Sequence, residues 1–153
     1  MRFTLDANVL VYAVDSNADH RHDEAAELVR DAARSDCVLT LQALGEFVNA
    51  ATRRRRRPIS EIAGFVGDWT TNFPVHAASP RVLPAAIEVV DRHGLAFWDA
   101  MLWAAAHEAG CAVVLSEDFQ DGRSLDGVTF INPFADRNAA LHAALLGGEA
   151  RRR

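Results

Sequence analysis

Apolar residues fall into short runs that alternate with longer segments in which they recur at helical spacing. The short runs, bounded by turn residues, predict strands, and the longer segments predict amphipathic or buried helices. The predicted strands are residues 2–5, 37–41, 74–78, 111–116 and 127–132, the third being the weakest. The predicted helices are residues 23–34, 41–54, 59–69, 82–92, 98–109 and 136–146.

Strands separated by helices predict an α/β fold with a central, mainly parallel sheet of about five strands, covered by helices on both faces. A chain of 153 residues, half of them apolar, is the size of one domain, and no internal repeat or linker divides it. We therefore expect a single domain over residues 1–146. Residues 147–153 form an Arg-rich tail with nothing to pack against, and we expect it to be disordered.

The basic residues are unusual, because all sixteen are arginine and lysine is absent. Without lysine the chain cannot build a P-loop, a Schiff-base lysine or a phosphoaspartyl site of the receiver or haloacid-dehalogenase kind. The net charge of -5 argues against indiscriminate nucleic-acid binding. Arginine nevertheless suits bidentate contacts with phosphate.

Cysteine usage and the N-terminal sequence bear on localisation. Cys37 and Cys111 sit beside apolar runs and do not resemble a disulfide framework, which favours a reducing compartment. Asp6 interrupts the first apolar stretch before it could serve as a secretory core, and no apolar run is long enough to cross a bilayer. We expect a cytoplasmic protein that does not contact the membrane.

Two aspartates directly follow predicted strands. Asp6 ends the first strand, and Asp118 comes just after the fourth. In open α/β sheets ligands bind outside the carboxyl ends of the strands, so these side chains from distant parts of the chain are candidates for one site. An alternative stays open, since Asp6 and Asn8 are also residue types that cap helices and form Asx turns.

Two further carboxylates lie on predicted helices. Asp99 opens a helix that is apolar almost all round, where it either stabilises the helix dipole or reaches a cleft. Glu46 lies opposite an apolar stripe that runs from Leu41 to Ala51, on the same face as Gln42. The helical period does not tell whether that face meets bulk water or a groove. Taken alone, Glu46 is more simply explained as a glutamate that faces solvent.

Taken together, these positions resemble the PIN-domain ribonucleases, and within them the VapC-like toxins of type II toxin-antitoxin systems. The matching features are a D-x-N after the first strand, a glutamate on an early helix, a D-A at a helix start and an S-x-D after a strand. The similarity covers nearly the whole chain, including the closing "FINPF". Phe97 and Trp98 stand where many members have Tyr, and Ser116 where Thr is frequent; neither change removes a carboxylate.

The resemblance implies a PIN-like three-layer α/β/α fold and endoribonuclease activity that depends on Mg²⁺ or Mn²⁺. Asp6 and Asp99 would hold the principal ion, while Glu46 and Asp118 would bind it directly, through water, or hold a second ion. It also implies a cognate VapB-like antitoxin, an RNA substrate and a homodimer.

This chemistry suits the residue types. Hydrolysis of an anionic phosphodiester is assisted by a hard divalent cation, which prefers oxygen ligands, whereas His and Cys would favour zinc. Carboxylates crowded together without metal should have at least one raised pKa. We expect Asn8 and Ser116 to orient carboxylates or waters. Asp121 is a candidate for the same outer role, although an aspartate before Gly122 is also typical of a turn, and we expect Glu117 to face solvent.

Several other motifs have two interpretations. The run Arg53, Arg54, Arg55, Arg56 and Arg57 is either a solvated helix end or a contact for an RNA backbone or an acidic antitoxin segment. The H-x-H at His20 and His22 reads as a loop leading into a helix, because no further ligand completes a zinc set. Trp69, Trp98 and Trp103 are expected in the core or at a subunit interface rather than stacked on bases.

Two alternatives to a ribonuclease remain at this point. A non-catalytic RNA- or protein-binding module would keep the fold and use the carboxylates as caps. A structure-specific DNA nuclease of the flap type is related, but its helical arch should require a longer chain.

Overall fold

The structure, a computed structural model, describes residues 1–147, so that most of the tail predicted to be disordered lies outside the described residues. Its larger sheet has the order β1-β4-β6-β5, with β1 at Phe3–Leu5, β4 at Val113–Leu115, β5 at Ser124–Leu125 and β6 at Val128–Ile131. All pairs in it are parallel except β5 with β6. A second parallel pair, β2 (Leu39–Thr40) with β3 (Val75–His76), is joined to β1 through a bridge between Phe3 and Cys37.

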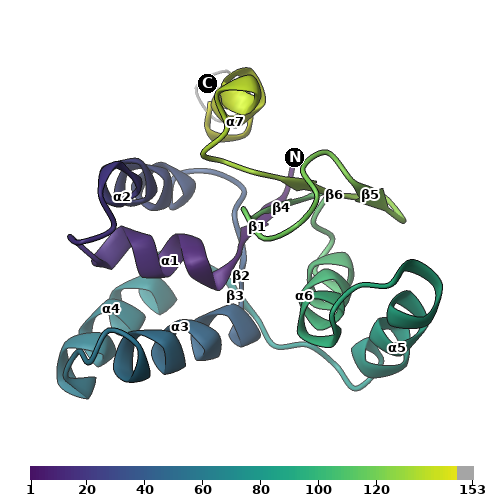
Figure 1. Ribbon diagram of the computed structural model, residues 1–153, viewed down its shortest axis with the longest axis horizontal. Coiled ribbons are helices and arrows are strands. Elements are labelled where there is room, and N and C mark those ends of the chain that lie inside the picture. Colours follow the sequence, from purple (N-terminus) through teal and green to yellow (C-terminus); the bar gives the residue numbers. More distant parts are fainter. Residues whose placement is uncertain (148–153) are drawn as a thin grey trace.

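Helices cover both faces of this sheet (Figure 1). On one side lie α1 (Ala7–Val14), α2 (His20–Ala32), α3 (Leu41–Arg53) and α4 (Ile59–Asn72), and on the other α5 (Val82–His93) and α6 (Phe97–Glu108). A short 3-10 turn, Asp136–Asn138, leads into α7 (Ala139–Leu146). The predicted three-layer, mainly parallel α/β fold is confirmed. Within residues 1–147, no helix combines the length and the apolar character needed to span a membrane.

Two apolar cores follow from the alternation of side chains along the strands. Val113 and Leu115 of β4 pack into a core with α1 to α4, whereas Val114 packs into a second core with α5 and α6. Trp69 lies in the first core and Trp103 in the second, as expected from their residue type. Trp98 is the exception, since 64% of its surface is exposed.

Two elements were not predicted from the sequence. Residues 7–14 form α1, but the run "ANVLVYAV" is apolar nearly throughout and therefore carries no helical period. The strand β5 has only two residues and pairs with β6 as a hairpin. Its turn is Asp126-Gly127, both at positive φ (45° and 81°), which is the dipeptide and backbone that two-residue hairpins favour.

Candidate active site

The edge of the sheet where β1 and β4 end brings Asp6 next to Ser116. Leu5 pairs with Leu115 in parallel register, and the Asp6 backbone N–H donates to the Leu115 carbonyl (3.0 Å). Ser116 Oγ then donates to Asp6 Oδ2 (2.6 Å), and both residues are buried. Asp6 occupies the N-cap position of α1, yet its carboxylate makes no capping hydrogen bond. Its side chain is therefore directed to the sheet edge rather than used to start the helix.

Asp118 lies at the same edge and is held by the two neighbours expected to orient it. Its carboxylate accepts a hydrogen bond from Asn8 Nδ2, and its backbone N–H donates to Ser116 Oγ (3.1 Å). Ser116 thus contacts Asp6 with its proton and Asp118 with its lone pair. Asn8 and Asp118 are 110 residues apart in the sequence, and the pairing of β1 with β4 brings them together.

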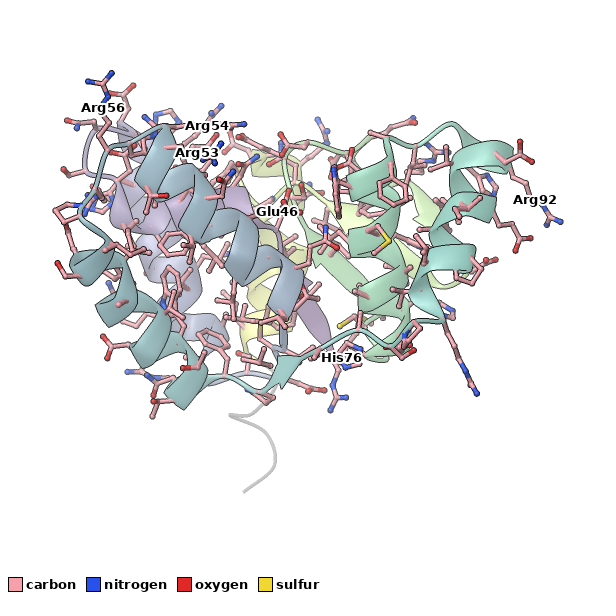
Figure 2. The ribbon with its side chains drawn as sticks, turned by 90° about the horizontal axis from the view of Figure 1, so that it is seen from below. Glu46, Arg53, Arg54, Arg56, His76 and Arg92 are labelled. Carbon is pink, nitrogen blue, oxygen red and sulfur yellow. The ribbon has the colours of Figure 1, made fainter. Side chains whose placement is uncertain are left out.

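Glu46 and Asp99 approach from two helices on opposite sides of the sheet edge. Asp99 lies in the first turn of α6, and Glu46 lies midway along α3, on the side that faces α6 (Figure 2). Gln42 connects the two helices, because its Nε2 donates both to Glu46 Oε1 (2.7 Å) and to the backbone carbonyl of Trp98 (3.1 Å). The polar face of α3 therefore lies next to the start of α6 at Gln42, while Glu46 itself remains exposed.

Burial and neighbouring negative charge raise the pKa of two of the carboxylates, Asp6 and Asp99. Burial raises the pKa of Asp6 from 3.8 to about 7, and the nearby charges of Asp118 and Glu46 add to this, while the Ser116 hydrogen bond partly offsets it. The pKa of Asp99 is also raised, by burial and then by Asp118 and Glu46. Because the same two charges act on Asp6 and on Asp99, the structure gathers the four sequence-predicted carboxylates in one electrostatic neighbourhood.

The oxygen atoms of these four carboxylates are suitable ligands for a hard divalent cation. A positive ion would offset both the burial and the neighbouring negative charges that raise the pKa of Asp6. Within the described part of the chain, no three His, Cys, Asp or Glu residues are close enough to hold an ion as their side chains stand. Each of three carboxylates instead accepts a hydrogen bond from a different side chain: Asp6 from Ser116, Asp118 from Asn8 and Glu46 from Gln42.

Asp121 makes its hydrogen bonds away from this cluster. Its carboxylate accepts from the Asn132 backbone N–H (2.7 Å) and from Asn138 Nδ2 (2.9 Å), and it pairs with Arg137 (2.6 Å). Burial by itself would raise the pKa of Asp121, but these three partners lower it overall. They tie the loop before β5 to the segment after β6.

The expectation that Glu117 faces solvent is wrong. Its carboxylate accepts a hydrogen bond from the Tyr12 hydroxyl and lies 3.5 Å from Arg21, and only 15% of its side-chain surface is exposed. Tyr12 lies on α1 and Arg21 on α2, so local sequence around Glu117 gave no signal of either partner.

The five consecutive arginines divide into two groups. Arg55 pairs with the buried Asp15 (3.0 Å), and Arg57 donates to the Val14 carbonyl and pairs with Glu61. Both therefore fasten the end of α3 to the end of α1 or to α4. Arg53, Arg54 and Arg56 are exposed and form no ion pair with any residue that the structure describes. Figure 2 shows Arg53 and Arg54 beyond Glu46 along the same helix.

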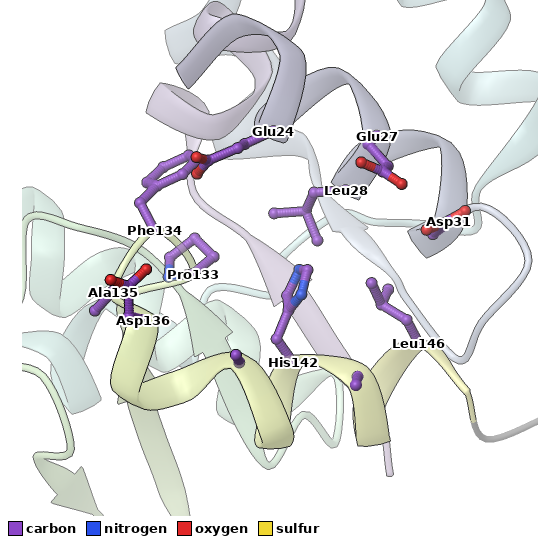
Figure 3. Close-up of a pocket in the computed structure, with 12 residues that line it drawn as sticks. Glu24, Glu27, Leu28, Asp31, Pro133, Phe134, Ala135, Asp136, His142 and Leu146 are labelled. Atoms are coloured by element: carbon purple, nitrogen blue, oxygen red, sulfur yellow. The ribbon is translucent and has the colours of Figure 1, made fainter. Parts of the chain in front are cut away.

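The histidines have local roles. His20 and His22 lie in the first turn of α2 rather than in a loop before it, and His22 Nδ1 is 2.9 Å from the Tyr12 carbonyl. A hollow of about 430 Å³ between α2 and α7 holds His142, whose Nε2 is buried and has no hydrogen-bond partner among residues 1–147 (Figure 3). Burial lowers the pKa of His142, against the opposing effect of Asp31, Glu27 and Glu24. None of the residues lining this hollow belongs to the carboxylate cluster.

Several solved structures share this fold. VapC20 of Mycobacterium tuberculosis, a toxin that cleaves the sarcin-ricin loop, is 19% identical, with a TM-score of 0.62 over 76% of this chain and 91% of that one. A DNA-bound VapBC of Salmonella typhimurium is 14% identical (TM-score 0.61; 87% and 98% covered). A toxin-antitoxin complex of Klebsiella pneumoniae is 18% identical (TM-score 0.58; 86% and 97% covered). No curated protein sequence matches the chain.

The carboxylates also fall in the part of the chain that matches a known family. The model of the PIN domain matches residues 3–120, which include Asp6, Glu46, Asp99 and Asp118. The initial resemblance to this family is confirmed. The chain belongs to the PIN domain family, a family of nucleases.

Proposed function

We propose that this protein is an endoribonuclease that hydrolyses RNA phosphodiesters with Mg²⁺ or Mn²⁺ and acts as the toxin of a toxin-antitoxin pair. The observation that carries the proposal is the convergence of four carboxylates, from two strand ends and two helices, at one edge of the sheet. A binding module that used them as caps would not need them together. Asp6 in particular makes no side-chain cap.

The bound cation would neutralise charge on the phosphoryl oxygens and favour deprotonation of an attacking water. Asp6 and Asp99 would hold it, with Glu46 and Asp118 as further ligands or as ligands of a second ion. Three hydrogen bonds keep the carboxylate oxygens in place: Ser116 donates to Asp6, Asn8 to Asp118 and Gln42 to Glu46. Arg53 and Arg54 stand beyond Glu46 on α3, where they would meet the RNA backbone.

The choice of RNA and of a toxin role draws on the structural neighbours. VapC20 is described as cleaving the sarcin-ricin loop, and other neighbours were solved as toxin-antitoxin complexes. A VapB-like antitoxin has a suitable surface on this chain. A groove of about 450 Å³ is lined by apolar residues of α1, α2 and α4, among them Phe65 and Trp69. Two arginines, Arg30 and Arg34, and one carboxylate, Asp68, also line it. Such a groove would accept an apolar helix face that carries acidic residues.

We also propose a homodimer. Leu83 and Ile87 lie one helical turn apart on α5 and are both about half exposed (47% and 55%), as large apolar residues at a subunit interface would be in a separated protomer. Sedimentation of the purified chain tests this. Dissociation of a dimer by Leu83→Glu together with Ile87→Glu supports the assignment, and a wild-type monomer contradicts it.

Expression of the wild type and of Asp99→Asn in a bacterial host tests the proposed activity. The wild type should slow growth and create new RNA 5′ ends, whereas Asp99→Asn should do neither. Asp91→Asn, the same change at an exposed aspartate of α5, is the matched control and should behave as the wild type. Equal growth and identical RNA ends for wild type and Asp99→Asn would overturn the proposal, as would preferential cleavage of branched DNA.

A further inference from the structure

Trp98 differs from the other two tryptophans in its surroundings. Trp69 and Trp103 are 8% and 4% exposed and belong to the cores, whereas Trp98 is 64% exposed in the first turn of α6. Leaving an indole in water forgoes the large gain from burying it, so such a residue marks a contact surface. It directly precedes Asp99 on α6, so the residue that carries the exposed indole is next in the chain to one of the clustered carboxylates.

The backbone and ring of Trp98 are held in place. Its carbonyl accepts a hydrogen bond from Gln42, the same side chain that holds Glu46. The Phe97 ring packs edge-on against the indole, with centroids 5.1 Å apart and planes at 65°. This arrangement supports one edge of the indole and leaves most of its surface free. A ligand that stacks on it would have little ordering cost to overcome.

A second protein copy is a poor occupant for this position. Packing protein over Trp98 would also remove water from Asp99 and Glu46, and burying carboxylates without a compensating charge is costly. Leu83 and Ile87 on α5 offer an apolar surface without that cost. A nucleotide is different, because its phosphate would lie at the carboxylate cluster with the proposed cation, while its base offers a flat apolar face that can stack on an indole.

We propose that Trp98 is a stacking platform for an unpaired nucleobase of the substrate, next to the phosphate that is cleaved. The assignment rests on the proposed nuclease function and adds a residue that contacts the substrate. The base must be unpaired, because a base within a duplex is already stacked. It also replaces the expectation that Trp98 serves the core or a subunit interface.

Binding measurements test this separately from cleavage. Fluorescein-labelled single-stranded oligoribonucleotides of each base and a matched duplex are titrated with the protein in Mg²⁺, in an Asp6→Asn background that blocks cleavage. Trp98→Ala should weaken binding of at least one single-stranded probe about tenfold. Trp98→Tyr should retain most of the affinity, and duplex binding should not change. Ile59→Ala removes an equally exposed (64%) apolar side chain from α4 and should have no effect.

The outcomes separate this inference from the proposed function. Unchanged single-strand affinity in Trp98→Ala would overturn the stacking role even if the wild type cleaves RNA. Dissociation of a dimer by Trp98→Ala would assign the residue to self-association instead. Trp98-dependent binding by a wild type that cleaves no RNA would support the platform and contradict the nuclease proposal.

Discussion

Asp6 is buried beside negatively charged residues, and these surroundings determine the pH at which its carboxyl loses a proton. Its exposed surface is only 6%, and Asp118 and Glu46 act on it from the same sheet edge. The raised pKa of about 7 means that the folded protein binds this proton more tightly than the unfolded chain does. Without a bound cation, the protonated carboxyl is therefore the favoured form below about pH 7.

The stability of the metal-free protein should therefore depend on pH. The stabilisation from protonated Asp6 is fully present below its ordinary pKa of 3.8 and is lost as the pH rises through about 7. In EDTA, the melting temperature of the wild type should fall over this range relative to that of Asp6→Asn, which has no proton to lose. Thermal unfolding followed by circular dichroism measures both curves, and parallel curves would contradict a raised pKa at Asp6.

Gln42 should influence metal affinity without being a ligand. Gln42→Ala removes the amide that holds Glu46 and the Trp98 carbonyl, so Mg²⁺ affinity measured by isothermal titration calorimetry should fall about tenfold. Asn72→Ala is the control, because Asn72 is an exposed amide whose side chain donates to the Asp68 carbonyl within α4. Equal Mg²⁺ affinities for wild type and Gln42→Ala would show that Glu46 needs no such support.

Single residues show what sequence could and could not reveal. Asp6 and Asp118 were predictable as neighbours because parallel strands end at the same edge. The helical wheel placed Gln42 beside Glu46, but its hydrogen bond to Trp98 crosses 56 residues and depends on packing. Glu117 was misjudged for the same reason, since its partners Tyr12 and Arg21 arrive from distant helices.

At the level of elements, the end of α3 serves two purposes. Arg55 and Arg57 anchor it to α1 and α4, while Arg53, Arg54 and Arg56 point to solvent. A run of identical residues cannot indicate this division, because only the positions of Asp15, Val14 and Glu61 in the fold select which arginine is bound.

Arg55→Ala should lower the free energy of unfolding by about 1–2 kcal/mol, because it leaves the buried Asp15 without its cation while the arginine itself is half exposed. Arg54 precedes Arg55 and forms no ion pair with any described residue. Arg54→Ala should therefore change the free energy of unfolding by less than about 0.5 kcal/mol. Urea denaturation measures both variants. Equal stabilities would mean that the Arg55–Asp15 pair contributes nothing.

The missed elements have physical explanations too. The helix α1 has the composition of a buried strand, and its helical state is decided by packing between α2 and α3. The strand β5 is too short to produce a period, although its Asp-Gly turn was visible in the sequence. Long amphipathic helices such as α3 were predicted almost to the residue, because their period is repeated over several turns.

The whole molecule carries a net charge of -5 and concentrates negative charge at its candidate active site. RNA binding therefore requires local positive charge, for which the exposed arginines are the candidates. Replacing Arg53, Arg54 and Arg56 together with Ala should weaken binding of all RNA sequences alike. It should also flatten the dependence of log affinity on log salt by about one unit for each phosphate that is no longer neutralised by an arginine. An unchanged salt dependence would remove these arginines from the RNA path.

Cleavage by the purified protein tests the proposed metal-dependent nuclease activity most directly. Bacterial RNA is incubated with the wild type, with Asp99→Asn and with Asp91→Asn, each in Mg²⁺ or in EDTA, and the 5′ ends are mapped by sequencing. We expect a defined set of new ends for the wild type and Asp91→Asn in Mg²⁺ only. New ends that persist in EDTA, or that Asp99→Asn produces equally well, would contradict a metal-dependent site built from these carboxylates.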